Sequence, residues 1–370
     1  MASRSRPALR LYAGAAARQH IQRHGVQPQH IGVIAGAAGG PKGLILGALD
    51  RFIFGHWLPQ STQPVALVGA SIGAWRLASA CLPDPEAALR AFEQAYVHQD
   101  FALGPGQRAP RPAEVSAVFA RNVHAFYAGQ LDALLQHPRY ALHIVTARGR
   151  GLLGRDTPLR RTLGFAGAWA SNAVARRALG LWLQRVVFSS ARSDGPAALP
   201  FATADLPTVQ HALTVHNFEA ALCASCSIPF ALQAVAQIAG APDGAYWDGG
   251  LTDYQLHLHY ADRARPDAPL VLYPHFLPQL VPGWLDKPMR WRHQATPALS
   301  PVLVLAPDPD WVRTLPGGKL PDRSDFYRYA ADLPARVRAW HAATAAAEQL
   351  ADDWARWLAA PDVRQVLPLP

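Results

Sequence analysis

The feature that most restricts the fold is a pattern near the start of the chain, in which a buried strand leads through a glycine-rich turn into a helix. Residues 30–35 (HIGVIA) and 65–68 (VALV) are short apolar runs rich in β-branched side chains, which predicts strands buried on both faces. Glycine-rich turns at 36–43 and 69–73 follow them, and helical apolar spacing comes next. Two such units in succession form a βαβ arrangement, which predicts a parallel sheet.

The rest of the chain continues this alternation of strands and helices. Three more apolar runs predict strands, at 141–146, 269–273 and 301–306. Helices are expected at four further places: 8–24, 83–99, 113–135 and 324–359. We therefore predict a three-layer α/β/α fold with a mainly parallel central sheet.

The domain organisation follows from length and composition. The chain has 370 residues, and 50% of them are hydrophobic, so it can form a substantial core. No linker separates two independent halves. We predict a single domain over 1–370, with a motif-bearing core at 31–256 and a C-terminal extension at 265–370.

A serine lies between two glycines in the second turn, in the order Gly69-Ala-Ser71-Ile-Gly73. In a G-x-S-x-G turn between a strand and a helix, the serine adopts a strained conformation that exposes its hydroxyl above the sheet. The glycines are needed because Cβ atoms there would collide with neighbouring backbone. We predict Ser71 to be a nucleophile. The alternative is a plain glycine-rich turn whose serine caps the next helix.

A nucleophilic serine needs donors for an oxyanion, and the earlier turn, GGPKG at 39–43, offers them. Pro41 has no N–H, so the candidate donors are Gly39, Gly40 and Lys42. The turn is not a phosphate-binding Walker loop, because Gly43 follows Lys42 where that loop has Ser or Thr. A plain tight turn is the alternative.

The serine also needs a base, and Asp248 is the best-placed candidate. It follows an aromatic strand end and precedes two glycines, which permits close backbone approach. An aspartate in water has a pKa of about 3.9, so partial burial would make it a better base. The chain also has 15 histidines, but none is distinguished by its surroundings.

Together these pieces resemble the patatin-like phospholipase family. The matching motifs occur in the family's order: GGPKG at 39–43, GASIGA at 69–74, ASCSIPF at 224–230 and WDGG at 247–250. The resemblance implies lipid acyl hydrolysis by a Ser–Asp dyad without histidine. It assigns Ser71 as nucleophile and Asp248 as base, with oxyanion donors at Gly39, Gly40 and Lys42.

Two departures from the family pattern are visible. The family's first turn usually opens with an aspartate and three glycines, whereas this chain has Ala37 and Ala38 before Gly39 and Gly40. After Asp-Gly-Gly the family often continues to an asparagine and a proline, whereas this chain continues with 251–254, LTDY. The first departure affects the rigidity of the turn, and the second the support of the aspartate.

The cysteines, the N-terminus and the apolar stretches bear on cofactors and localisation. Three cysteines exclude a disulfide scaffold, and Cys223 and Cys226 lack the further ligands that a zinc site needs. The N-terminus lacks the apolar segment of a signal peptide. The uncharged stretch 220–242 contains Ser, Gln, Pro and Gly and suits a buried loop and helix. We expect a cytoplasmic protein that requires neither metal nor organic cofactor.

The net charge of +9 is concentrated in one segment. Eight arginines and a single acid, Asp156, lie between 148 and 185, and aromatic and aliphatic residues separate them. Such a segment suits peripheral contact with an anionic membrane through 148–188, as a lid or docking element. The alternative is a cap with a solvated basic face. Nucleic acid is disfavoured because no nucleic-acid motif accompanies the charge, and no protein partner can be inferred.

The sequence thus favours a serine hydrolase that cleaves a lipid carboxylic ester through an acyl–Ser71 intermediate. Three alternatives stay open: an acyltransferase with the same dyad, a hydrolase with a histidine triad, and an inactive lipid-binding or regulatory module. The sequence does not indicate head group, acyl length or oligomeric state.

Overall fold

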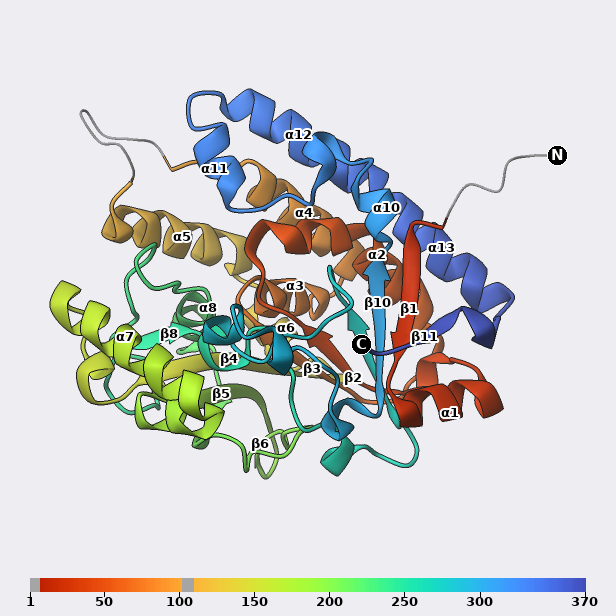
Figure 1. The fold of residues 1–370 in the computed structure, drawn as a ribbon, viewed down its shortest axis with the longest axis horizontal. Coiled ribbons are helices and arrows are strands. Elements are labelled where there is room, and N and C mark those ends of the chain that lie inside the picture. Colours follow the sequence, from red (N-terminus) through yellow and green to blue (C-terminus); the bar gives the residue numbers. More distant parts are fainter. Residues whose placement is uncertain (1–6, 102–109) are drawn as a thin grey trace.

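One β-sheet of eleven strands runs through the part of the chain that the computed structural model describes, residues 7–101 and 110–370 (Figure 1). The strands are β1 (Leu9–Ala13), β2 (Ile31–Gly36), β3 (Val65–Ala70), β4 (Tyr140–Gly149), β5 (Leu183–Arg192), β6 (Gly195–Pro196), β7 (Thr208–Leu213), β8 (Tyr246–Asp248), β9 (Leu270–Pro274), β10 (Val302–Pro307) and β11 (Val366–Pro368). Their order is β11-β1-β10-β9-β2-β3-β4-β5-β6, and β7 and β8 pair with β5 and β4.

The centre of this sheet is parallel, as the βαβ pattern predicted. β10, β9, β2, β3 and β4 are parallel neighbours. Antiparallel pairs occur toward the two sides, between β1 and β10 and between β4 and its neighbours β5 and β8. The residues of β2 are all buried, and those of β3 nearly so, which explains their continuous apolar sequences.

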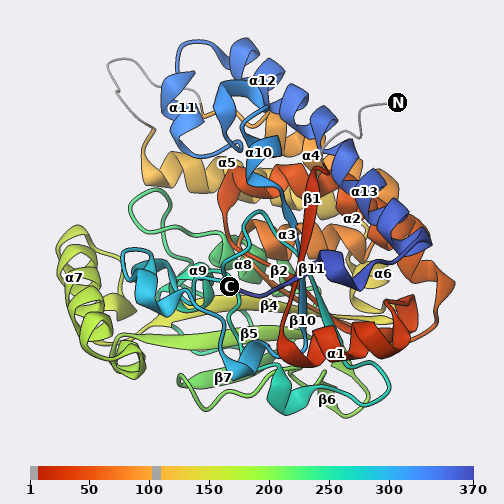
Figure 2. The same cartoon turned by 45° about the vertical axis from the view of Figure 1, so that its right-hand side comes forward.

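Helices cover both faces of the sheet, so the predicted three-layer α/β/α fold is confirmed. The α-helices are α1 (Ala15–His24), α2 (Gly47–Arg51), α3 (Ile72–Ala80), α4 (Pro85–Val97), α5 (Pro112–Tyr127), α6 (Leu131–Leu135), α7 (Pro158–Val174), α8 (Phe218–Ser225), α9 (Gly250–Asp253), α10 (Pro309–Val312), α11 (Ser324–Arg328), α12 (Leu333–Ala346) and α13 (Glu348–Ala359). α3 lies against β2, β3 and β4, and α4 covers α3. α12 and α1 lie on opposite sides of the strands in both views (Figures 1 and 2).

The prediction of an opening helix over 8–24 is wrong for its first part. Leu9, Leu11, Tyr12 and Ala13 are buried while Arg10 is exposed, and this segment forms β1 against β10. α1 begins only at Ala15. Burial between β10 and β11 therefore overrides the helical spacing at the start of this segment.

The predicted helix over 113–135 is divided into α5 and α6. Gly129 separates them with φ +73°, a left-handed conformation that ends a helix and favours glycine. The closing helical region at 324–359 is likewise divided, and Pro334 stands in the first turn of α12, where its missing N–H costs no hydrogen bond.

Strands of the C-terminal extension lie inside the sheet rather than beside it. β9 pairs with β2, and β10 lies between β9 and β1. The residues of β9 and β10 are buried throughout. We propose on this basis that 1–370 folds as one domain. A search of the described helices finds none with the length and apolarity needed to cross a bilayer.

Candidate functional site

Ser71 stands at the end of β3, at the point where the chain turns into α3. Its backbone has φ 55°, one of three positive φ values at non-glycine residues in the described chain. Such a conformation costs about 1–3 kcal/mol and persists only where the surroundings enforce it. Here the following helix and the packed turn fix it, as a G-x-S-x-G motif between strand and helix predicts.

The two glycines around Ser71 permit close contacts between backbone segments. A Cβ at Gly73 would lie 1.9 Å from the carbonyl oxygen of Gly36, at the end of β2. A Cβ at Gly69 would lie 2.4 Å from Cα of Ala74. Neither neighbour is a side chain that could move aside, so both positions require glycine.

Asp248 reaches Ser71 from the short strand β8, which pairs antiparallel with β4. Ser71 Oγ donates a hydrogen bond of 2.8 Å to Asp248 Oδ2. The other carboxylate oxygen accepts a hydrogen bond of 2.7 Å from the Gly250 N–H. Residues that are 177 positions apart in the sequence are therefore in direct contact, and both are buried.

The glycines after Asp248 are also required by close packing. A Cβ at Gly249 would lie 2.1 Å from the Val145 carbonyl oxygen in β4. A Cβ at Gly250 would lie 2.8 Å from the Ala38 side chain. The WDGG motif thus brings the aspartate against β4 and against the glycine-rich turn after β2.

The ASCSIPF segment connects to both members of this pair. The Ser71 N–H donates to Ser225 Oγ at 2.9 Å, and Ser225 Oγ in turn donates to the Val145 carbonyl at 2.7 Å. The Asp248 N–H donates to the Ser227 carbonyl at 2.9 Å. These bonds fix the backbones of Ser71 and Asp248 relative to one element, so their side chains meet in a defined geometry.

Burial raises the pKa of Asp248 above the ordinary aspartate value. Arg323, the Gly250 N–H, the Ser71 hydroxyl and Lys287 oppose this shift because they favour the carboxylate. The carboxylate is therefore a stronger proton acceptor than an aspartate in water, while nearby cations and donors keep the ionised form accessible.

The turn at 39–43 follows Ala38, which lines a small cavity together with Asp248. Gly40 has φ +57°, and a Cβ on Gly39 would lie 2.4 Å from the Phe276 ring, so both positions favour glycine. Neither glycine's N–H is hydrogen-bonded to another residue in the described ranges. Lys42 lies in the 3₁₀ helix that begins at Gly40, and its ammonium lies 5.8 Å from the Phe276 ring centroid.

The two alanines before Gly39 are packed inside the fold. Ala37 and Ala38 are buried in the core, and the Ala38 N–H donates to the Tyr254 carbonyl at 3.0 Å. This backbone bond connects the turn to the segment after Asp248.

Three cations that the sequence analysis did not identify as a group converge on this site. Arg323 lines a small cavity together with Asp248, Ala38 and Tyr254. The Lys287 ammonium lies 4.1 Å from the Tyr254 ring centroid, and desolvation lowers its pKa to about 8. Desolvation also lowers the pKa of Lys42. None of the three side chains has an ion pair within the described residues.

Sequence reasoning missed this cluster because the three residues are far apart in the chain. Lys42 was singled out for its backbone N–H alone, and Lys287 and Arg323 lie in the C-terminal extension, where no motif marked them. Only composition could have pointed to this cluster, since Lys287 is one of only three lysines in the chain.

A buried ion pair anchors the segment after Asp248, and the arginine-rich composition gave no indication of it. Arg185 is fully buried and binds both carboxylate oxygens of Asp253, at 2.7 and 2.6 Å. It also binds Asp205, at 2.9 and 2.8 Å. Asp253 belongs to the sequence LTDY that replaces the family's asparagine and proline, so this pair supports α9 directly after Asp248.

The eight arginines at 148–185 are not all exposed. Arg185 is buried, Arg176 pairs with Asp286 at 2.7 Å, and Arg161 pairs with Asp156 at 2.9 Å. Three of the eight arginines are thus neutralised inside the fold. Arg155, Arg160 and Arg177 are among those that remain exposed.

The histidines and cysteines contribute no alternative centre in the part of the chain described. No histidine there hydrogen-bonds to Ser71 or Asp248. His257, for example, bonds to Leu280 and Thr296. His275 bonds to Leu277, and His293 bonds to Asp286. Cys223 and Cys226 are free thiols, and burial raises the pKa of both. No cluster of three or more metal-ligating side chains occurs among these residues.

Comparison with known proteins gives one family match. A family model described as patatin-like phospholipase matches residues 35–255, which include both glycine-rich turns, the ASCSIPF segment and Asp248. The match covers more than half of the chain. No curated protein matches the chain.

The buried pair of Arg185 and Asp253 yields a stability prediction. Arg185→Gln removes the cation that pairs with the buried Asp253 and with the half-buried Asp205, so we expect the free energy of unfolding to fall by about 3–5 kcal/mol. Urea denaturation followed by circular dichroism measures this change. Arg177→Gln removes the same charge from an exposed site and is expected to change stability by less than about 0.5 kcal/mol. Equal stability of the two variants would contradict the structural role of Arg185.

Proposed function

The chain belongs to the patatin-like phospholipase family, and from this premise we propose that it is a lipid acyl hydrolase with Ser71 as nucleophile and Asp248 as general base. The observation that carries the assignment of residues is the 2.8 Å hydrogen bond from Ser71 Oγ to the buried Asp248 carboxylate. A serine activated by a hydrogen-bonded base is the arrangement that nucleophilic acyl transfer requires.

The first half of the proposed reaction forms an acyl-enzyme. Asp248 accepts the hydroxyl proton as Ser71 Oγ bonds to the carbonyl carbon of the ester. The N–H groups of Gly39 and Gly40, with that of Lys42 as a third donor, stabilise the negative charge on the carbonyl oxygen. The bond to the alcohol oxygen then breaks, and Asp248 returns the proton to that oxygen, so that the alcohol leaves.

The second half releases the acid. Asp248 takes a proton from water, and the water oxygen attacks the carbonyl carbon of the acyl–Ser71 ester. When the bond to Ser71 Oγ breaks, the proton returns from Asp248 to the serine, and a carboxylic acid leaves. The raised pKa of Asp248 supports both halves, because the carboxylate must accept a proton twice in each cycle.

The cations around the site favour a substrate with a negatively charged head group. Arg323, Lys287 and Lys42 have no ion pairs among the described residues, and Arg323 lines the same cavity as Asp248. A guanidinium that has no ion pair and lies beside the reacting ester would bind a phosphate through charge-assisted hydrogen bonds. We therefore propose a phospholipid substrate rather than an uncharged acylglycerol.

The segment 148–188 is proposed as the membrane contact, with an apolar rather than a mainly basic face. Six of the eleven large hydrophobic residues that are exposed in the described chain lie in this segment: Leu152, Leu159, Leu163, Trp169, Val174 and Leu181. Most of them belong to α7, which lies at the periphery of the molecule in both views (Figures 1 and 2). An exposed apolar face flanked by arginines suits the surface of an anionic bilayer.

This face is connected to the proposed active site through aromatic packing. The Phe165 ring of α7 lies 5.5 Å, centroid to centroid, from the Trp247 ring, and Trp247 immediately precedes Asp248. α7 therefore packs against β8, the strand that carries Asp248, at the residue that precedes the aspartate.

The dyad is tested by ester hydrolysis. Ser71→Ala and Asp248→Asn should each lower kcat for a short-chain nitrophenyl ester by about 10³-fold or more, because each removes a group that acts in every turnover. Circular dichroism checks that both variants fold. In the unaltered protein the activity should fall as the pH decreases through the pKa of Asp248, with a midpoint above the pKa of an ordinary aspartate. Full activity in either variant would refute the dyad.

The head-group preference is tested with Arg323→Gln. We expect hydrolysis of phosphatidylglycerol to fall about tenfold relative to hydrolysis of diacylglycerol, because one charge-assisted contact is lost. The ratio is the relevant measurement, since any change in the pKa of Asp248 affects both substrates alike. Arg328→Gln removes an exposed charge from α11, the helix that begins directly after Arg323, and should leave the ratio unchanged. An unchanged ratio in Arg323→Gln would argue against charge recognition at this position.

The membrane face is tested by vesicle sedimentation. Two kinds of vesicle are compared, anionic ones of phosphatidylglycerol and uncharged ones of phosphatidylcholine. Replacing Leu159, Leu163 and Trp169 together by serine should weaken binding to both kinds more than tenfold, because less apolar surface is removed from water. Replacing Arg155, Arg160 and Arg177 by glutamine should weaken binding only to the anionic vesicles. Tyr327→Ser, which removes an exposed aromatic ring from α11, is the control. Unchanged binding in both triple variants would contradict the proposed contact.

A further inference from the structure

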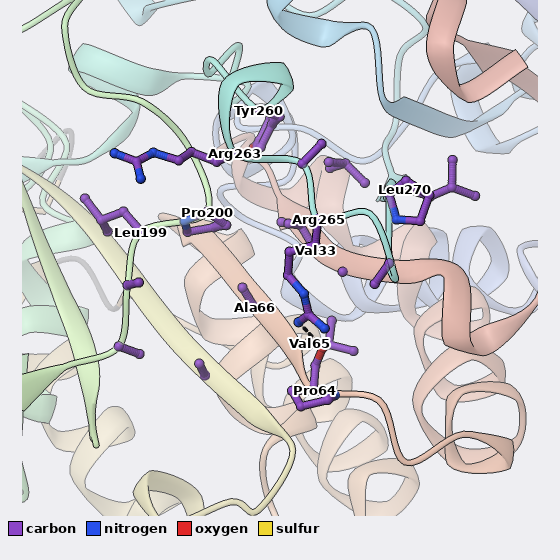
Figure 3. A pocket seen from close by; sticks show the side chains of 18 of the residues that line it. Val33, Pro64, Val65, Ala66, Leu199, Pro200, Tyr260, Arg263, Arg265 and Leu270 are labelled. Carbon is purple, nitrogen blue, oxygen red and sulfur yellow. Dashed lines mark hydrogen bonds between the residues drawn. The ribbon is translucent and has the colours of Figure 1, made fainter. Parts of the chain in front are cut away.

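A second cavity lies at the end of the sheet opposite to Ser71. It has a volume of about 420 Å³ and touches the first residues of β2 and β3, namely Gly32, Val33, Val65 and Ala66 (Figure 3). Ser71 follows the last residue of β3. Because a strand rises about 3.3 Å per residue, the five residues from Ala66 to Ser71 span about 16 Å. The cavity is therefore separate from the proposed active site.

The floor of this cavity is apolar and consists largely of the sheet itself. Val33, Ala66, Ala141 and Val271 come from β2, β3, β4 and β9, which are adjacent strands. Leu199 adds an apolar wall from the segment after β6. A surface of this kind accommodates an aliphatic chain.

The lining of the cavity includes no acidic residue. Its rim carries four arginines, namely Arg139, Arg192, Arg263 and Arg265. The Arg265 side chain crosses Figure 3 toward Pro64, whose carbonyl it binds at 3.3 Å, and it also pairs with Asp267. The side-chain hydrogen bonds of Arg139 and Arg192 go to backbone carbonyls, those of Gln63 and Tyr140.

Of these four arginines, Arg265 alone has an ion pair among the described residues. Carbonyl bonds use some of the five N–H donors of a guanidinium but do not neutralise its charge. The side chain of Arg263 makes no hydrogen bond or ion pair with any other described residue. The cavity thus combines an apolar floor with a cationic rim, and planar guanidinium groups bind carboxylates and phosphates in a bidentate manner.

We propose that this cavity binds an amphipathic anion, with an aliphatic chain on the apolar floor and a carboxylate or phosphate head at the arginines. The volume lies within the range of about 300–1,000 Å³ that is usual for small-molecule sites. The proposal does not depend on the proposed hydrolase activity, because none of the residues involved belongs to the Ser71 site.

The test is isothermal titration of the full chain with dodecanoate, dodecyl phosphate and uncharged dodecanol, each below its aggregation limit. We expect saturable binding of at least one of the two anions and binding of dodecanol that is at least tenfold weaker. The anion that binds more tightly identifies the head group as carboxylate or phosphate.

Variants locate the binding site. Arg139→Gln combined with Arg263→Gln should weaken binding of the anion at least tenfold. Arg263→Gln alone removes no side-chain hydrogen bond or ion pair among the described residues, so the fold should stay intact and binding should weaken severalfold. Arg338→Gln removes an exposed charge from α12 and is the control. The absence of saturable binding, equal binding of dodecanol, or unchanged binding in Arg263→Gln would overturn the proposal.

Discussion

The site depends on how closely four backbone segments approach one another around Ser71. The ends of β2 and β3, the start of α3 and the residues after β8 meet at distances that leave no space for a Cβ at Gly73 or Gly249. This close packing holds Ser71 at φ 55° and places Asp248 within hydrogen-bond distance of its hydroxyl. The strain at Ser71 is sustained by the surrounding backbone, and the contact between serine and carboxylate is its consequence.

The electrostatic environment then determines what this contact can do. Burial favours the protonated form of Asp248, whereas Arg323, Lys287 and the Gly250 N–H favour the carboxylate. The balance produces a carboxylate that accepts a proton more readily than one in water but does not remain permanently neutral. Arg323 and Lys287 come from the C-terminal part of the chain, whose strands β9 and β10 lie within the sheet. The same folding event therefore builds the sheet and supplies the charges near the aspartate.

Much of the fold could be predicted from the sequence because local patterns encode it. The apolar runs of β2 and β3 and the glycine turns after them predicted a parallel sheet, and the motifs predicted which residues would meet at its edge. β1 was not predicted, because it is buried by pairing with β10, which is distant in the sequence. Arg185 was misinterpreted for the same reason: composition places it in a basic segment, and only the fold pairs it with Asp253. The converging cations Lys42, Lys287 and Arg323 share no local pattern at all.

We propose that Ser71 becomes covalently acylated with the help of Asp248. Rapid quenching of the reaction with an activated long-chain ester, followed by mass spectrometry of the peptides, tests this most directly. The account predicts a transient mass increase equal to the acyl group on the peptide that contains Ser71, and no such increase in Asp248→Asn. Continued ester turnover without any acylated Ser71 peptide, or with the acyl group on another residue, would contradict it.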